Sequence, residues 1–293
     1  MKRHLYKIIV LLLAMFLLVS SVFSAEVEEK ESLAAPVASG VLTKKIGKTT
    51  IDYSNTKDGY VMVNYGAEQA RRMKVQIKGP KTTYTYDLLP GQWAVFPLTE
   101  GDGSYQTFVY QNVSGTRYST LASVKFQVTL ENEFIPFLQP SQYVNYTAAP
   151  NTVAKAAEVV QGKATTLDKV KAVYDFVIGH LTYDKQLAAM VQSGYVPDLD
   201  AVLEKKTGIC FDYAAMMTGM LRSQGIPCKM VFGYVGTAYH AWISVWSEET
   251  GWVDTIYFDG TSWSQMDPTF ASGALHSGSA NNSNLVYTSK YQY

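Results

Sequence analysis

The chemistry-bearing residues of this chain are few, and its two cysteines are the starting point. Cys210 lies in the run GICFDYA at positions 208–214, where a predicted helix over 209–223 begins. A thiol at a helix N-terminus meets the positive end of the helix dipole and backbone amides that lack helical partners. Both favour the thiolate, which is the nucleophilic form. Cys210 is therefore a candidate nucleophile, and the same amides could stabilise an oxyanion.

A disulfide to Cys228 is the main structural alternative for Cys210. A helix of about 15 residues is roughly 22 Å long, and Cys228 follows its far end by only a few residues. Those residues return at most about 16 Å, whereas bridged Cα atoms lie within about 7 Å, so the bridge is barely within reach. Local chemistry leaves a reactive, a buried and a bridged thiol open. Gly208 is expected to leave room for a substrate backbone.

Three histidines remain beyond the first 25 residues as candidate bases. His180 ends a helical pattern, where a positive side chain complements the last carbonyls, so a structural role suffices. His276 lies in a Ser/Gly/Asn-rich stretch and is expected to be solvated. His240 opens a predicted strand and can act as a base, although a surface strand histidine is the alternative.

Asp267 is the preferred partner for a catalytic histidine. Pro268 follows it, which biases Asp267 toward an extended conformation at the end of a predicted strand. An aspartate there can bind the second imidazole nitrogen and fix the tautomer. Asp254 and Asp259 are rivals, but Asp254 is explained by a solvent-facing strand position and Asp259 by an Asp-Gly hairpin turn.

The elements that precede these residues fall into two halves with different periodicity. Over residues 40–146 apolar residues alternate with polar ones, as in Met73, Val75 and Ile77, and Gly- and Pro-containing turns separate the segments. This alternation is typical of strands with one buried face. It predicts an antiparallel β-sandwich domain of immunoglobulin or fibronectin type, in which no catalytic constellation is recognised.

The second half, residues 147–293, predicts helices followed by an antiparallel sheet. Helical spacing covers 153–161, 167–181 and 209–223, with Thr166 expected as the N-cap of the second helix. Four strands are expected after the third helix, over 229–235, 240–246, 251–258 and 262–267. The whole chain is therefore expected to be α+β.

The first 25 residues are typical of a secretory signal peptide. Three basic residues within the first seven precede an apolar run over 8–19, and small residues follow up to Ala25. The run is shorter than the ~20 residues that a membrane span needs, so cleavage near Ser24 or Ala25 is expected, with an uncleaved anchor as the alternative. Cleavage leaves 22 basic against 25 acidic residues. This balance offers no basic patch for nucleic acid or an anionic membrane.

Several linked motifs resemble the transglutaminase-like superfamily. The GICFDYA run resembles its cysteine helix, and the segments that begin at His240 and Asp267 are similar to its two further catalytic strands. The order Cys, His, Asp and the intervals of 30 and 27 residues fit that family. The stretch from Lys169 to Asp184 is similar to the helix that precedes the core. The resemblance covers roughly residues 150–270 and is to a bacterial-type secreted member.

The resemblance implies a papain-like α+β fold for residues 147–293 and a triad of Cys210, His240 and Asp267. Cys210 would attack an amide carbonyl, His240 would shuttle the proton, and a thioester would form. Family members also place an upstream side chain in the oxyanion hole, for which Tyr174 and Tyr183 both remain open. No acidic run is spaced like a calcium loop, so the calcium control of animal transglutaminases is not expected, and neither is any cofactor.

The expected function is secreted or cell-surface thiol acyl transfer on protein or peptide amides. A cysteine peptidase or amidase is the nearest alternative, because the outcome depends on whether an amine or water resolves the thioester. A catalytically silent adhesion or scaffold protein is the alternative from a different class. The expected partner is a protein or peptide substrate, with the cell surface as one location, and no integral membrane segment is expected after signal cleavage.

Overall fold

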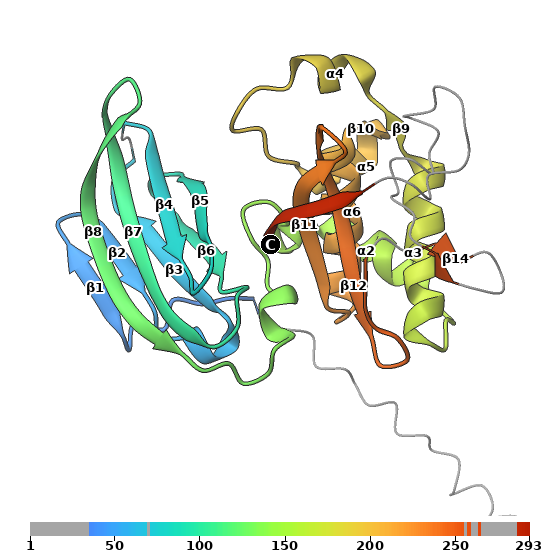
Figure 1. The fold of residues 1–293 in the computed structure, drawn as a ribbon, viewed down its shortest axis with the longest axis horizontal. Helices are drawn as coiled ribbons and strands as arrows, with labels where there is room; N and C mark the ends of the chain where they lie inside the picture. Colours follow the sequence, from blue (N-terminus) through green and yellow to red (C-terminus); the bar gives the residue numbers. More distant parts are fainter. Residues whose placement is uncertain (1–34, 69–70, 255–256, 259–262, 265–285) are drawn as a thin grey trace, which may run out of the picture. The chain divides into compact units, whose positions relative to one another are not determined.

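The computed structural model describes residues 35–68, 71–254, 257–258, 263–264 and 286–293. All the described residues belong to one compact unit. The described part contains both helices and antiparallel sheets, which confirms the expected α+β class (Figure 1). The predicted division into domains over 40–146 and 147–293 stays a prediction.

Two four-stranded antiparallel sheets account for the N-terminal half. The first has the order β1-β2-β3-β6, with β1 (Thr43–Ile46), β2 (Thr49–Asp52), β3 (Tyr60–Tyr65) and β6 (Trp93–Pro97). The second has the order β5-β4-β7-β8, with β4 (Met73–Lys78), β5 (Thr83–Leu88), β7 (Gly103–Ser114) and β8 (Arg117–Val128). The sandwich of immunoglobulin or fibronectin type stays a prediction.

Period-two alternation in the sequence produces the buried faces of these sheets. On β4 the side chains of Met73, Val75 and Ile77 are at most 1% exposed, and the residues between them face outward. Apolar residues of both sheets join one hydrophobic core, which continues into the helices of the C-terminal half. The alternation therefore identified the inward faces correctly.

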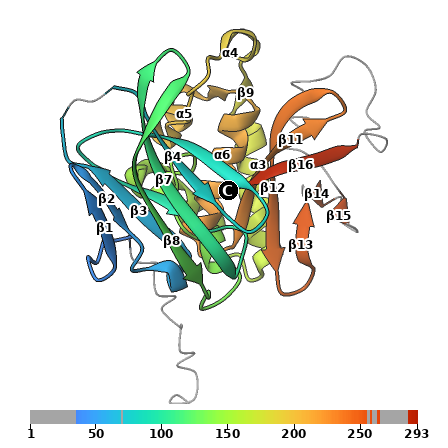
Figure 2. The ribbon, with the colours of Figure 1, turned by 60° about the vertical axis from the view of Figure 1, so that its left-hand side comes forward.

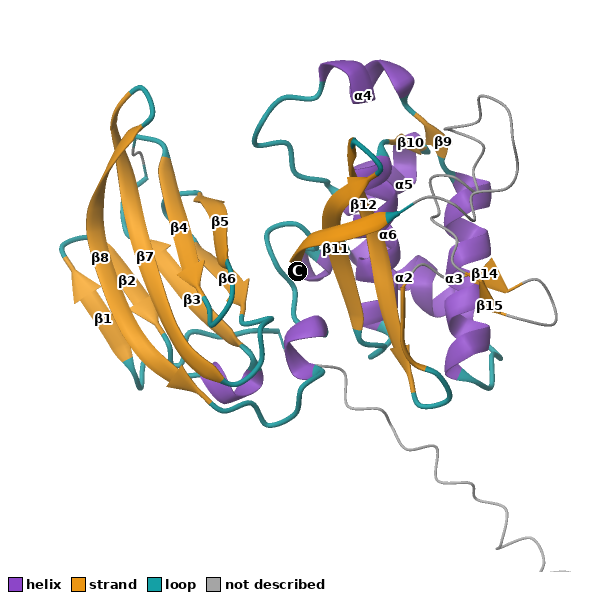
Figure 3. Cartoon of the chain, in the orientation of Figure 1, coloured by secondary structure: helices purple, strands orange, loops and turns teal. Residues whose placement is uncertain are grey.

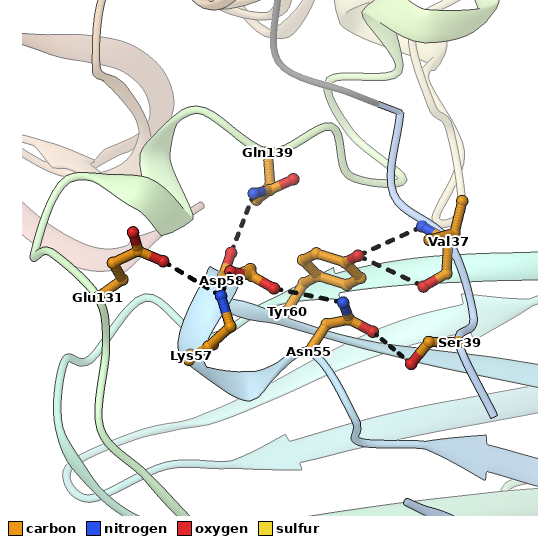
Figure 4. Close-up of polar contacts among 8 residues, drawn as sticks. All are labelled: Val37, Ser39, Asn55, Lys57, Asp58, Tyr60, Glu131 and Gln139. Carbon is orange, nitrogen blue, oxygen red and sulfur yellow. Dashed lines mark hydrogen bonds and ion pairs between the residues drawn. The ribbon is translucent and has the colours of Figure 1, made fainter. Parts of the chain in front are cut away.

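The segment between the halves is held against the turn that precedes β3. That turn is η1 (Thr56–Asp58). Lys57 forms an ion pair with Glu131 at 3.2 Å, and Gln139 Nε2 donates to the Asp58 carbonyl oxygen at 2.9 Å (Figure 4). Two short 3-10 turns, η2 (Ile135–Phe137) and η3 (Tyr146–Ala148), complete the segment. It is thus a packed connection, with Gln139 only 4% exposed.

Five α-helices are described in the C-terminal half, coloured purple in Figure 3. They are α2 (Pro150–Val160), α3 (Thr166–His180), α4 (Lys185–Met190), α5 (Leu199–Lys205) and α6 (Cys210–Ser223). The cap of α3 corrects the sequence-based expectation by one residue. Thr165, in an extended conformation, accepts a hydrogen bond from the Asp168 amide, and Thr166 is already helical.

Helix α6 is the centre of the C-terminal half because it is apolar on nearly all sides. Met216, Met217 and Met220 are fully buried, and most other positions from Asp212 to Arg222 are buried as well. A helix that is apolar all round belongs inside a fold. The helix packs against α2, α3 and α5 and against the sheet that follows it. Its first residue therefore has a fixed position.

The second-half sheet has the order β13-β12-β11-β16 (Figure 2). Its strands are β11 (Cys228–Val235), β12 (Ala238–Ser247), β13 (Gly251–Asp254) and β16 (Tyr287–Gln292). Of the predicted strand over 251–258, residues 251–254 form β13, paired with β12, and residues 257–258 form β14 (Tyr257–Phe258), which pairs with β15 (Trp263–Ser264). Residues 255–256 lie outside the described residues. A short parallel pair, β9 (Thr182–Tyr183) with β10 (Thr207–Gly208), leads into α6.

Candidate active site

Cys210 is the first residue of α6, as the sequence predicted. Ile209 before it is extended, with φ −100° and ψ 179°, and Tyr213 makes the first helical bond to the Ile209 carbonyl. The amides of the first turn therefore have no helical acceptor. The Cys210 side chain is partly exposed, and both cysteines are free thiols, so the disulfide alternative does not hold in the structure.

Asp212 fixes the start of the Cys210 helix. Its Oδ2 accepts from the Ile209 amide at 2.8 Å, and its Oδ1 accepts from the Tyr195 hydroxyl at 2.7 Å. The carboxylate is fully buried, which raises its pKa, while the two hydrogen bonds oppose that shift. A carboxylate near a helix N-terminus also interacts favourably with the helix dipole. The helix start is therefore held by a side chain two residues from the thiol.

The role expected for Gly208 needs correction. A Cβ placed there would lie 2.5 Å from the Asp212 Cβ and 2.9 Å from its Oδ2. The space above Gly208 is therefore filled by Asp212, and the glycine is required for this internal contact. The sequence could not separate the two explanations, because a close approach demands glycine in both.

His240 is the third residue of β12, where it lies opposite Gly233 of β11. It is 6% exposed and stacks on Trp242 with ring centroids 6.4 Å apart. The alternative of an exposed surface histidine is thus wrong. Register and burial together fix the position of the imidazole, because His240 is paired with β11 and its side chain is enclosed.

Cys210 and His240 line the same cavity, which has a volume of about 490 Å³. Tyr183, Tyr195 and Tyr239 are among its other walls. The nucleophile candidate comes from a helix start and the base candidate from a strand, 30 residues later in the chain. The structure therefore brings two of the three predicted site residues to one cavity.

The third predicted residue, Asp267, lies outside the described residues, as do its rival Asp259 and His276. Asp254 ends β13, opposite Ser244 of β12. His180 lies at the end of α3, where its Nε2 is 2.8 Å from the Leu203 carbonyl oxygen. That contact supports the structural role expected for His180.

Of the two tyrosines left open for the oxyanion hole, Tyr183 lines the Cys210 cavity. Tyr174 is buried in the core on α3, at 3% exposure. Tyr183 reaches the cavity because β9 pairs in parallel with β10, directly before the cysteine helix. The placement favours Tyr183 without assigning it a role.

Cys228, by contrast, is a core residue. It is fully buried at the start of β11, and its Sγ donates to the Thr218 hydroxyl at 3.6 Å. Burial raises the pKa of this thiol to about 11. Cys228 is therefore neutral at physiological pH, and it lies neither at a helix start nor in the wall of the Cys210 cavity.

Sequence reasoning missed part of the cavity wall. Lys74, Thr85 and Asp87 of the N-terminal half line it, together with Gln142 from the connecting segment. The Gln142 side chain accepts from the Asp87 amide at 3.2 Å and donates to the Asp87 carbonyl at 2.7 Å, as a neighbouring strand would. No sequence signal marks these residues, because they reach the site through tertiary packing alone.

Among the described residues, no group of three or more His, Cys, Asp and Glu side chains could hold a metal ion. Within the same residues, no helix has the length and apolar character needed to cross a membrane.

Comparison with known proteins confirms the resemblance predicted from the sequence. Residues 153–268 match the family model of the transglutaminase-like superfamily. A protein-glutamine gamma-glutamyltransferase of Pseudomonas aeruginosa is 34% identical over 74 residues, which are 20% of this chain and 11% of that protein. Human kyphoscoliosis peptidase is 28% identical over 120 residues, which are 41% of this chain and 18% of that protein. The chain thus spans less than a fifth of the length of these relatives.

Solved structures show a lower similarity. One is a Cytophaga hutchinsonii protein provisionally assigned as a cysteine protease. The alignment covers 78% of this chain and 74% of that protein's chain, with 15% identity and a TM-score of 0.37. The alignment with red sea bream transglutaminase covers 72% of this chain and 48% of that one, with 13% identity and a TM-score of 0.29. The family match covers less than half of the chain, so residues 153–268 are similar to the transglutaminase-like superfamily, and the relatives that they match include a gamma-glutamyltransferase and a peptidase.

Proposed function

We propose that this protein is a thiol enzyme that acts on protein or peptide amides through Cys210, His240 and Asp267. The observation that carries the proposal is the shared cavity of Cys210 and His240, with Cys210 at a helix start. Asp267 enters from the sequence motif, as the residue that orients the imidazole. The relatives named above include a transferase and a peptidase. Acyl transfer and hydrolysis both begin with attack on an amide, so the proposal covers both.

The proposed reaction has two steps that conserve atoms and charge. The Cys210 thiolate forms a bond to the amide carbonyl carbon, the carbon–nitrogen bond breaks, and protonated His240 gives its proton to the leaving amine. Amides of the first turn of α6 would stabilise the oxyanion. An incoming amine or water then loses a proton to His240, attacks the thioester carbonyl and releases the thiolate. The product is a new amide or a carboxylic acid.

The test separates transfer, hydrolysis and absence of catalysis. The protein is incubated with dimethylcasein and a biotin-labelled primary amine, and the casein peptides are analysed by mass spectrometry. Amine incorporation at glutamine supports transfer, and conversion of glutamine to glutamate or cleavage of the chain supports hydrolysis. Cys210→Ala should abolish either product, whereas Cys228→Ala serves as the matched control and should retain it. If the wild-type protein forms neither product, the proposal fails and the catalytically silent scaffold protein is the alternative that remains.

We propose in addition that the chain is exported, because its first 25 residues have the order of a secretory signal. N-terminal sequencing of protein recovered from the culture medium should begin close to Glu26. Recovery of a membrane-bound form that retains Met1 would contradict export by cleavage and would support the anchor alternative.

A further inference from the structure

The loop over residues 191–196 is a wall of the Cys210 cavity. It follows α4 and leads toward α5. Its first four residues, 191–194, are exposed, whereas Tyr195 is half-buried and reaches inward. The loop has no helix or strand structure of its own. Its backbone bonds are local, from the Val191 amide to the Leu187 carbonyl and from the Tyr195 amide to the Gln192 carbonyl. The side-chain contacts of Tyr195 are therefore the ones that tie this wall to the cysteine helix.

Tyr195 binds the two residues that follow the candidate nucleophile. Its hydroxyl donates to Asp212 Oδ1 at 2.7 Å, and its ring meets that of Phe211 edge-on, with centroids 6.1 Å apart. Burial raises the pKa of Tyr195, so the hydroxyl keeps its proton and remains a donor at neutral pH. A hydrogen bond to a buried carboxylate is stronger than one between neutral groups.

Asp212 has a separate contact that does not need the loop. Its other oxygen accepts from the Ile209 amide, which holds the start of α6. One carboxylate therefore serves two purposes, with one oxygen for the helix and one for the loop. This division allows the loop contact to be removed while the helix contact stays.

The exposed end of the loop lies close to the N-terminal half. A Cβ at Gly194, which has φ +95°, would lie 3.7 Å from Asp87 Oδ2 and 3.8 Å from Arg72 Nη2. Asp87 itself lines the cavity and pairs with Arg72 at 3.1 Å. The loop therefore lies between the cysteine helix and strand β5, where a shift of its backbone changes the width of the cavity.

We propose that the Tyr195–Asp212 hydrogen bond is a latch that fixes the 191–196 loop and so sets how large a group can reach Cys210. Tyr195 is then a positioning residue that determines specificity, because it acts through the loop and not on the reacting atoms. This inference rests on the proposed function, since it concerns access to the same thiol.

The test compares thiol reagents of different size in full-length Cys228→Ala protein, in which Cys210 is the sole cysteine. Tyr195→Phe removes only the hydroxyl, and Tyr110→Phe on β7 is the matched control. For Tyr195→Phe, labelling by fluorescein maleimide should accelerate about tenfold, because a hydrogen bond to a charged group no longer opposes loop opening. Labelling by iodoacetamide, which is small, should change less than about twofold. Tyr110→Phe should leave both rates unchanged.

Equal acceleration of both reagents would overturn the latch, because it would mean that the helix start itself had loosened. Unchanged rates would overturn it as well. Should Tyr195→Phe fold poorly by thermal unfolding, Asp212→Asn weakens the same bond and should shift the bulky-reagent rate in the same direction. Hydrogen exchange of the 191–196 amides should rise in either variant, and unchanged exchange would contradict the proposal.

Enzyme assays extend the test without replacing it. With dimethylcasein as acyl donor, Tyr195→Phe should change KM several-fold and kcat little, since the variant alters access and leaves the triad in place. If the unmodified protein modifies no amide at all, the proposed function fails while the labelling and exchange results still judge the latch. The two failures are therefore distinguishable.

Discussion

The two thiols of this chain have opposite surroundings. Cys210 is partly exposed at a helix start and faces a cavity that it shares with His240. Cys228 is fully buried, beside Thr218 and the guanidinium of Arg222, and its pKa is raised to about 11 by burial. Exposure and ionisation both control alkylation, so the two residues should differ strongly in reactivity.

Limiting iodoacetamide at about pH 6 should therefore label Cys210 first, as read by peptide mass mapping. His240→Ala should slow the labelling of Cys210 at this pH, because it removes the proposed base, while Cys228 stays buried and reacts more slowly still. Asp267→Ala should slow the labelling less, since the imidazole remains but loses its orientation. Equal labelling of both cysteines in folded protein would contradict an activated Cys210.

The part of the site that the sequence revealed is the part encoded by local pattern. Cys210 was recognised from a helix start, and His240 from a strand motif. Tyr195 and Asp212 were not recognised, because a loop tyrosine and a helical aspartate become partners only when the chain has folded. Asp267 still rests on its motif, since it lies outside the described residues.

At the scale of elements, the position of His240 depends on how closely β16 approaches β11. Gly233 lies opposite His240 in β12 and opposite Ser289 in β16, and the β16 register shifts between Phe232 and Gly233. A Cβ on Gly233 would collide with the Thr288 carbonyl oxygen and lie 2.7 Å from Trp242. Glycine is therefore required there for close strand packing.

Gly233→Ala should lower the free energy of unfolding by about 2 kcal/mol or more, because β16 must move away from β11. Urea denaturation followed by tryptophan fluorescence measures the change. Gly179→Ala is the matched control: that glycine is exposed on α3 with open space around it, and the substitution should stabilise by about 0.5–1 kcal/mol. A neutral Gly233→Ala would show that β16 is loosely attached.

Elements with strong periodicity were predicted well, and short ones were not. The three long helices and the strands β11 and β12 follow their apolar patterns to within a few residues. Helices α4 and α5 have six and seven residues, which is too short for a helical period to emerge. Strand β16 follows a Ser/Gly/Asn-rich stretch, and its pairing with β11 is a long-range contact that the sequence does not signal.

At the scale of the whole molecule, one buried arginine joins segments that are distant in the sequence. Arg222, 1% exposed, donates to the carbonyl oxygens of Cys228, Gln139 and Tyr293. Burial lowers its pKa to about 10, still far above neutrality, so the guanidinium remains charged. Gln139 also binds Asp58 of the N-terminal half, which makes it one joint between the halves.

The contacts of Gln139 indicate at which residue a separate C-terminal fragment should begin. We expect a fragment over 147–293 to fold, but one over 132–293 should be more stable by about 2 kcal/mol or more. The longer fragment keeps the Gln139 carbonyl for Arg222 and the Tyr143 ring, which packs on Phe211 and Tyr293. Urea denaturation of both fragments measures the difference. Equal stability would mean that the connecting segment belongs to the N-terminal half alone.

Alkaline pH should destabilise the protein, because burial raises the pKa of several weak acids. The pKa of Cys228 is raised to about 11 and that of Tyr143 to about 12. The folded protein therefore holds these protons more tightly than the unfolded chain does. The resulting stabilisation is complete below the pKa that each group has in the unfolded chain, and it is lost as the pH rises through the pKa in the folded protein. The free energy of unfolding should fall between about pH 9 and pH 11.

Cys228→Ala isolates the contribution of the thiol to this pH dependence. Between about pH 8 and pH 11 the variant should lose less stability than the unmodified protein, by on the order of 2 kcal/mol. Urea denaturation at each pH gives both curves, and contributions from other groups cancel in the difference. Parallel curves would show that Cys228 titrates normally in the folded state.

The methionines of α6 have a further consequence for how the protein ages. Met216, Met217 and Met220 are fully buried, so dissolved oxidants do not reach their thioethers while the chain is folded. In an unfolded molecule each thioether can be oxidised to a sulfoxide. The polar sulfoxide oxygen cannot be buried in the apolar core without destabilising it. Transient unfolding in oxidising surroundings would then become irreversible, and the working lifetime of the protein would follow its unfolding rate.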